Sequence, residues 1–268
     1  MTLRRRLVTS AVLIGLAAAA LFGMNEEAFA VLAFAFVAAA LFEFFTLLRG
    51  AKIPCYRLFG VSMGAILPLV IAFERGATQS GEVLFIVIGC LFLFILQFST
   101  GKNEDALVGI ALTLFGILYV SWFLSFAVKI RYLDGGLMWV AYLLSVTKSA
   151  DIGAYVFGTL FGKHPLIAHV SPKKSVEGLF GGLALSLVVS LLFEPHLPRD
   201  WSAAHLAILG VLLGIVGQIG DLSESLMKRF CRVKDSGGLL PGMGGVLDAL
   251  DSILFTAPIF YFHLTVFK

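Results

Sequence analysis

The sequence carries little charge, and this shortage excludes most classes of soluble protein. Only 14% of its 268 residues are Asp, Glu, Lys or Arg, whereas soluble domains usually contain roughly 25%. The three cysteines are widely spaced and form neither a disulfide framework nor a zinc-binding pattern. We therefore expect no ordinary globular enzyme, no disordered protein and no partner that is a nucleic acid.

Apolar residues, by contrast, make up 59% of the chain and gather in long runs. A helix that crosses a bilayer needs about 20 apolar residues, and the alternation typical of a membrane β-barrel is absent. The sequence predicts an all-α integral membrane protein, a polytopic bundle of about nine transmembrane helices with little room for an extramembrane domain. The predicted spans are 7–23, 28–48, 56–73, 83–98, 106–128, 137–158, 176–193, 203–222 and 246–266.

The distribution of cations predicts the orientation of this multi-pass protein. Of the 20 lysines and arginines, 14 fall on the side of the N-terminus, 5 fall on the other side, and Lys148 lies within a span. Cytoplasmic loops carry an excess of Lys and Arg, so we expect a cytoplasmic N-terminus and a C-terminus on the opposite side. In a bacterium the membrane would be the inner one. Residues 4–30 also resemble a secretory signal, but a second apolar segment follows at once, and we expect the first helix to be retained.

Charged residues at membrane depth are costly, so each needs a role. We interpret Glu43, in the second span, as a residue that snorkels or pairs helices. Lys148 and Asp151 lie three residues apart in the sixth span and share one helix face. They either form an ion pair that holds helices together or line a polar cavity.

The densest polar stretch precedes the last span. Residues 236–245 contain five glycines, and Asp248 and Asp251 follow one turn apart. Glycines let backbone N–H groups face an anion, and a helix N-terminus favours negative charge. Asp221 closes the eighth span on the same side. Carboxylates beside phosphate-binding groups usually hold Mg²⁺, although the dipole of a helix start would by itself stabilise them.

The loop after the sixth span repeats this chemistry on the cytoplasmic side. Its Ser171-Pro172 pair is typical of a helix start, and Lys173 and Lys174 either attract anionic lipid or bind phosphate. No P-loop pattern occurs in the chain. Together these residues predict a membrane-embedded enzyme of phosphoryl or nucleotidyl transfer, with a soluble phosphate-bearing substrate, Mg²⁺ and a lipid co-substrate.

Residues 145–258 resemble the phosphatidate cytidylyltransferase (CDP-diacylglycerol synthase) family. The family signature is S-x-x-K-R-x-x-x-x-K-D-x-G-x-x-x-P-G-H-G-G-x-x-D-R-x-D. The matching residues are Ser225, Lys228, Arg229, Lys234, Asp235, Gly237, Pro241, Gly242, Gly244, Gly245, Asp248 and Asp251. Gly220-Asp221 and the 171–178 stretch also match family patterns, and Asp151 matches less specifically.

The resemblance implies transfer of the cytidylyl group of CTP to phosphatidic acid, which gives CDP-diacylglycerol and pyrophosphate. By this analogy residues 131–268 form the catalytic region, and residues 1–130 form an N-terminal region of about five helices. The resemblance implies that Asp221, Asp248 and Asp251 hold Mg²⁺ and a second cation such as K⁺, with Lys228 also catalytic. It places substrate at Asp151, Ser171, Lys173, Lys174, Ser225, Arg229, Lys234, Asp235, Gly237, Gly242, Gly244 and Gly245. It also implies a homodimer in the lipid bilayer.

Two departures from the signature leave the exact activity open. Met243 stands where the family has His, and Ala249 stands where it has Arg. Neither replacement carries charge, and alanine removes a bidentate phosphate ligand. Either the family's residues are dispensable here, or the chain is slower, inactive or specific for another lipid phosphate. Two further alternatives are a CTP-dependent lipid kinase, which catalyses a different reaction, and an ion-coupled transporter, which is a different class of protein.

Overall fold

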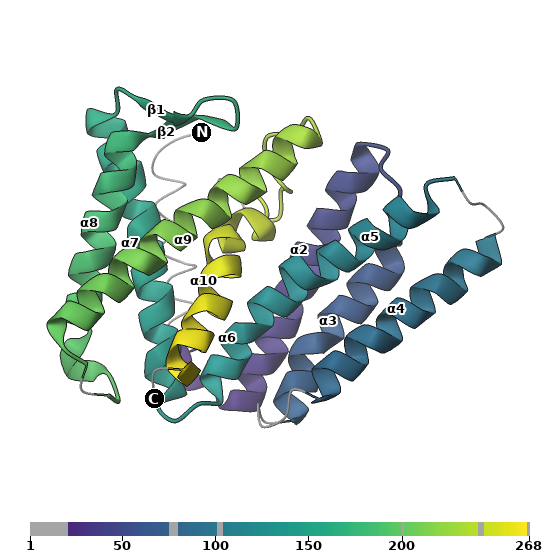
Figure 1. The fold of residues 1–268 in the computed structure, drawn as a ribbon, viewed down its shortest axis with the longest axis horizontal. Helices are drawn as coiled ribbons and strands as arrows, with labels where there is room; N and C mark the ends of the chain where they lie inside the picture. The colour runs from purple at the N-terminus through teal and green to yellow at the C-terminus, as the bar shows by residue number, and fades with distance from the viewer. Residues whose placement is uncertain (1–20, 75–79, 101–103, 200, 241–243, 267–268) are drawn as a thin grey trace. The chain divides into compact units, whose positions relative to one another are not determined.

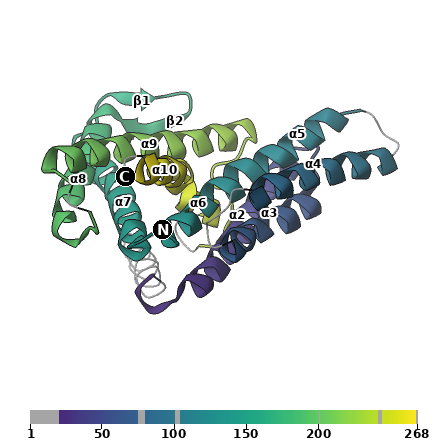
Figure 2. The ribbon, with the colours of Figure 1, turned by 60° about the horizontal axis from the view of Figure 1, so that its bottom comes forward.

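A computed structural model describes residues 21–74, 80–100, 104–199, 201–240 and 244–266, and these are almost entirely helical (Figures 1 and 2). Each predicted span from 28–48 onward coincides with a helix or with a continuous run of helices. The first span, 7–23, lies almost wholly outside the described residues. Within the described part, five helices are long and apolar enough to cross a membrane, and two shorter helices are also apolar. The chain is an all-α, multi-pass membrane protein, while the count of nine spans and the orientation stay predictions.

The helices divide into two compact units. The first unit comprises residues up to Tyr132 together with Cys231–Ala249, and the second comprises Leu133–Phe230 and the residues from Leu250 onward. The glycine-rich segment 236–245 therefore belongs to the same unit as the N-terminal helices, although it is far from them in sequence.

The first unit is built from four helical segments. These are α2 (Glu26–Gly50), α3 (Arg57–Phe73), α4 (Ser80–Thr100) and a continuous run of α5 (Ala106–Gly116), the π-helical turn η1 (Ile117–Trp122) and α6 (Phe123–Arg131). Asn25 caps α2, because its side-chain oxygen accepts a hydrogen bond from the Ala28 N–H at 2.9 Å. In the middle of the α5–α6 run, the Ser121 hydroxyl donates to the Gly64 carbonyl of α3.

The second unit contains α7 (Gly136–Phe161), α8 (Val176–Leu192), α9 (Ala203–Phe230) and most of α10 (Val246–Val266), with a short 3₁₀ turn, η2 (Glu194–His196), after α8. In lipid, helices associate through close packing, which small residues permit. A Cβ atom on Gly153 of α7 would lie 2.6 Å from the Gly181 carbonyl oxygen of α8. A Cβ atom on Gly178 of α8 would lie 2.8 Å from the Ala154 carbonyl oxygen. The backbones of α7 and α8 therefore touch directly.

A two-stranded hairpin joins α7 to α8 at one end of these helices (Figure 1). Strands β1 (Pro165–Ile167) and β2 (Ser171–Ser175) are antiparallel, with a bulge between the paired positions. Ser171-Pro172 thus lies in a strand, and the prediction that it starts a helix is wrong. The helix begins at Val176 because Ser175 caps it, with its hydroxyl accepting from the Gly178 N–H at 3.1 Å.

Candidate active site

A cluster of charged side chains lies where α9 meets α10 in the second unit. Gly220 sets the distance between these helices, since a Cβ atom there would lie 2.5 Å from the Asp251 carbonyl oxygen. The next residue in α9 is Asp221, so Asp221 and Asp251 both lie at the contact of α9 and α10. Asp251 is only 7% exposed. Two carboxylates at one helix contact repel each other unless positive charge lies nearby.

Helix α7 adds an ion pair to this cluster. The Lys148 ammonium donates to Asp151 Oδ2 at 3.0 Å and to Ser252 Oγ at 2.8 Å, and Ser252 Oγ donates to the same Asp151 oxygen at 2.8 Å. This network connects α7 to α10 at Ser252, the residue that follows Asp251. The structure therefore supports the first interpretation of the Lys148–Asp151 pair, an ion pair that links helices, while a polar cavity lined by the pair stays a prediction.

The hairpin supplies a second cation to the cluster. Lys174, on β2, forms an ion pair with Asp221, with Nζ 2.8 Å from Oδ2. Ser225, one turn after Asp221, places its hydroxyl 3.4 Å from the other oxygen. The neighbouring Lys173 is exposed, and Ser171 at the start of β2 is half-buried. Of the two lysines, Lys174 is thus the one held at the acidic cluster.

The cations at the end of α9 lie in two different environments. Lys228 is buried and forms an ion pair with Glu224, one turn earlier. Arg229 is exposed, and its Nε donates to the Val170 carbonyl of the hairpin at 3.2 Å. Arg229 therefore holds the end of α9 against the hairpin.

The glycine-rich segment 236–245 is fastened to the start of α10 in the first unit. Asp248 Oδ2 accepts hydrogen bonds from Ser236 N at 2.8 Å, from Ser236 Oγ at 2.7 Å and from Gly245 N at 2.8 Å. Leu240 and Gly244 exchange two backbone hydrogen bonds, and Gly244 adopts a φ of +99°, which glycine tolerates. One oxygen of Asp248 thus fixes both ends of this segment.

The remaining signature residues lie around this segment. Lys234 and Asp235 are exposed, Gly237 and Ala249 are half-buried, and Gly245 is buried. Gly242 and Met243 lie outside the described residues. Their predicted roles at the nucleotide stay predictions.

Of the two interpretations of Glu43, the structure supports helix pairing within the first unit. Glu43 is 3% exposed, so it does not snorkel to the membrane surface. Its carboxyl group accepts a hydrogen bond from the Leu247 N–H at the start of α10. The only signal for this contact in the sequence is a single acid in the apolar run 41–45, which does not identify a partner.

The fit of a metal ion can be judged from these side chains. Within the described residues no three His, Cys, Asp or Glu side chains are arranged to hold a metal ion. Mg²⁺, however, usually takes one or two carboxylates and completes its shell with water and substrate phosphates. Asp221 and Asp251 supply that number of carboxylates, and their use by Mg²⁺ stays a prediction.

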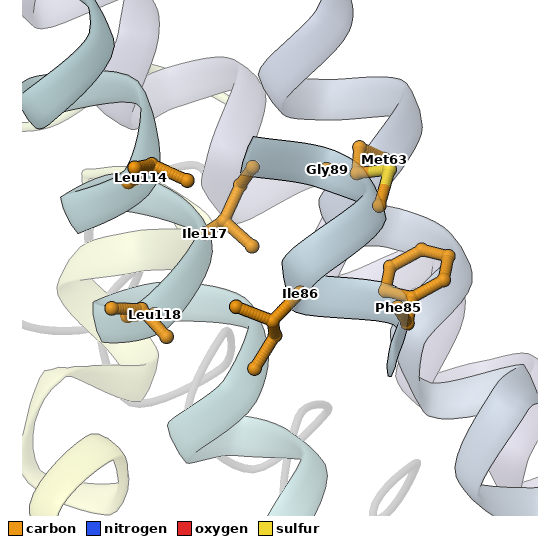
Figure 3. A pocket seen from close by; sticks show the side chains of 7 residues that line it. All are labelled: Met63, Phe85, Ile86, Gly89, Leu114, Ile117 and Leu118. Carbon is orange, nitrogen blue, oxygen red and sulfur yellow. The ribbon is translucent and has the colours of Figure 1, made fainter. Parts of the chain in front are cut away.

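Two other features of the described residues offer no site for this chemistry. The thiols are free, and burial raises the pKa of Cys231 and of Cys55 above the ordinary value, which disfavours a thiolate nucleophile. A small pocket in the first unit is lined only by apolar side chains and one glycine (Figure 3). Its lining residues are Met63, Phe85, Ile86, Gly89, Leu114, Ile117 and Leu118.

Comparisons with known proteins show the family of the chain. The model of the cytidylyltransferase family matches residues 4–267. The chain is 34% identical over 248 residues to the phosphatidate cytidylyltransferase of Bacillus subtilis (strain 168), a match that covers 90% of each protein. It is 35% identical over 199 residues to that of Staphylococcus saprophyticus, covering 74% of this chain and 76% of the relative. It is also 41% identical over 157 residues to the uncharacterized protein YnbB of Escherichia coli (strain K12), covering 58% of this chain and 51% of YnbB. The chain therefore belongs to the cytidylyltransferase family, and it is a membrane-bound nucleotidyltransferase.

Proposed function

We propose that this enzyme transfers the cytidylyl group of CTP to phosphatidic acid, at a metal-dependent site on the cytoplasmic side of the membrane. The names of two similar proteins support this substrate pair. The observation that carries the proposal is the presence of Asp221 and Asp251 at the contact of α9 and α10, with Lys174 paired to Asp221. Carboxylates that favour a cation, next to a lysine that favours phosphate, suit the binding of a nucleoside triphosphate with its metal.

The reaction is an in-line displacement at phosphorus. A phosphate oxygen of phosphatidic acid attacks the α-phosphorus of CTP, and a new phosphoanhydride bond forms. The bond from the α-phosphorus to the bridging oxygen breaks, and pyrophosphate leaves with that oxygen. The protein needs to make no covalent bond, so positioning and neutralisation of charge supply most of the rate.

The side chains of the cluster have roles that follow from their charge. Asp221 and Asp251 would hold Mg²⁺, which neutralises phosphate charge when bound. Lys174 would turn from Asp221 to a phosphate oxygen of the substrate, and the exposed Lys173 and Arg229 would neutralise further phosphate charge. Lys148 keeps Asp151 and Ser252 in place beside the pair. Asp248 as a third ligand, K⁺ as a second cation and a homodimer remain proposals based on family resemblance.

Membership in a nucleotidyltransferase family argues against the ion-coupled transporter. A lipid phosphate other than phosphatidic acid is the second candidate acceptor. The observation that favours it is the loss of two polar side chains of the signature, at Met243 and Ala249. A panel of lipid phosphates offered to the same preparation separates the two acceptors.

Asp221→Asn tests the role of the acidic pair. The amide keeps the size of the side chain but loses the charge that binds a cation, so we expect turnover of CTP with phosphatidic acid to be abolished. The measurement is the formation of labelled lipid from labelled CTP by purified protein in detergent with Mg²⁺. Asp105→Asn is the matched control, because Asp105 is exposed and its φ of 58° suits Asn.

Full activity of the Asp221→Asn protein would remove Asp221 from the metal site. A loss of activity that Asp105→Asn shares would point to damage to the preparation instead. If the unaltered protein labels lipid only when a different lipid phosphate is offered, the assignment of the site stands and the proposed acceptor changes.

A further inference from the structure

Helix α2 supplies one buried acid to the start of α10. Glu43 Oε2 accepts a hydrogen bond from the Leu247 N–H at 2.8 Å and lies 3.3 Å from Ser236 Oγ. The first N–H groups of a helix have no partner within the helix. Glu43 therefore caps α10 from a position 204 residues away in the sequence.

Glu43 and Asp248 hold the same serine from two sides. Ser236 Oγ lies 2.7 Å from Asp248 Oδ2 and 3.3 Å from Glu43 Oε2. The hydroxyl has one proton to donate, and it accepts from the Asp248 N–H at 3.3 Å. The two acids, one on α2 and one on α10, thus enclose the beginning of segment 236–245.

Two glycines of the segment make room for the carboxyl group of Glu43. A Cβ atom on Gly237 would lie 2.3 Å from Glu43 Oε1, and a Cβ atom on Gly245 would lie 2.3 Å from Oε2. Oε1 is buried, and among the described residues it has no hydrogen-bond partner. Gly237 and Gly245 therefore both lie against this carboxyl group, and a larger residue at either position would displace it.

We propose that Glu43 is a positioning residue that fixes residues 236–240 and 244–245, the described parts of the segment, and the first turn of α10, with Asp248, in the arrangement that binds CTP. The inference rests on the proposed function, and it assigns a task in catalysis to the N-terminal helices. A group that acts in this way lowers the mobility of the segment and the KM for CTP. A merely structural residue would change stability without changing either quantity selectively.

The mobility of the segment can be measured without any turnover. Gly238 is exposed, and a Cβ atom there would meet nothing within 4 Å, so Gly238→Cys introduces a reporter thiol with little disturbance. The rate of maleimide labelling at this thiol reports how tightly the segment is held. Full-length protein without the reporter gives the background from Cys55, Cys90 and Cys231.

Three variants of Glu43 are made with and without the reporter. Glu43→Ala removes both acceptors, and we expect faster labelling and a KM for CTP raised about 10- to 100-fold, the scale of loss caused by a misplaced binding group. Glu43→Gln keeps one acceptor oxygen for the Leu247 N–H, and we expect it to restore most of both properties. Glu43→Asp shortens the reach by one methylene and should be intermediate. It replaces the alanine variant if that protein does not fold.

Glu27→Ala is the matched control, because Glu27 is exposed in the first turn of the same helix. Its labelling rate and KM should equal those of the unaltered protein. The proposal is overturned if Glu43→Ala labels at the control rate with the control KM. It is also overturned if Glu43→Gln is inactive while its labelling stays slow, since Glu43 would then act through its charge. If no protein in the set transfers label to lipid, the proposed function fails, while the labelling rates still decide whether Glu43 holds the segment.

Discussion

At the scale of single residues, the proposed function depends on Asp221, Asp251 and Lys174. Asp221 and Lys174 are 47 positions apart in the sequence, and β2 and α9 bring them within 2.8 Å. The resemblance to family patterns at 171–178 and at Gly220-Asp221 predicts that both residues matter, yet it gives no reason to pair them. The pairing depends on a hairpin of three and five residues, which is too short to produce a clear alternation of apolar and polar residues.

Lys174→Ala should lower kcat/KM for CTP more than Lys173→Ala does. A hydrogen bond to a charged group is worth about 1.5–3 kcal/mol, which corresponds to a loss of roughly 10- to 100-fold for Lys174. Lys173 is exposed and held at no carboxylate among the described residues, so we expect a smaller effect from its loss. Steady-state kinetics on the two purified variants provide the comparison. Equal losses would mean that the ion pair with Asp221 has no special role.

At the scale of elements, the helices could be predicted and their contacts could not. A bilayer requires long apolar runs, so the spans from 28–48 onward could be found from composition alone. The close contact of α9 with α10 depends on Gly220, one of 28 glycines. Nothing in the sequence distinguishes a glycine that admits a neighbouring backbone from one in open space. The contact of Glu43 with Leu247 could not be predicted either, because nothing in the sequence identifies the Leu247 N–H as the partner of this acid.

Gly220→Ala should separate α9 from α10 and reduce activity. The added methyl group would lie 2.5 Å from the Asp251 carbonyl oxygen, and overpacking of this kind typically costs about 1–3 kcal/mol of stability. We expect a lower midpoint of thermal unfolding in detergent together with weaker turnover. Gly50→Ala is the control, since a Cβ atom at Gly50 meets nothing within 4 Å. Identical behaviour of the two proteins would show that the close approach at Gly220 is not needed.

At the scale of the whole molecule, the chain is a membrane protein with two compact units and chemistry-bearing residues in each. The second unit contains Asp221, Asp251 and Lys174, and the first contains Asp248, Glu43 and the glycine-rich segment. The composition predicted the membrane class because charge is scarce and apolar residues are abundant. It could not predict that residues 231–249 join the N-terminal helices, since that grouping depends on contacts between distant parts of the sequence.

The central claim, transfer of the cytidylyl group, is tested most directly by following two labels of CTP. Purified protein in liposomes with Mg²⁺ and phosphatidic acid receives CTP labelled at the α-phosphate in one sample and at the γ-phosphate in another. The account predicts that the α-label enters the lipid, that the γ-label leaves as pyrophosphate, and that EDTA stops both. Entry of the γ-label into the lipid would identify a CTP-dependent kinase and contradict the account, as would transfer of the α-label that EDTA leaves unchanged.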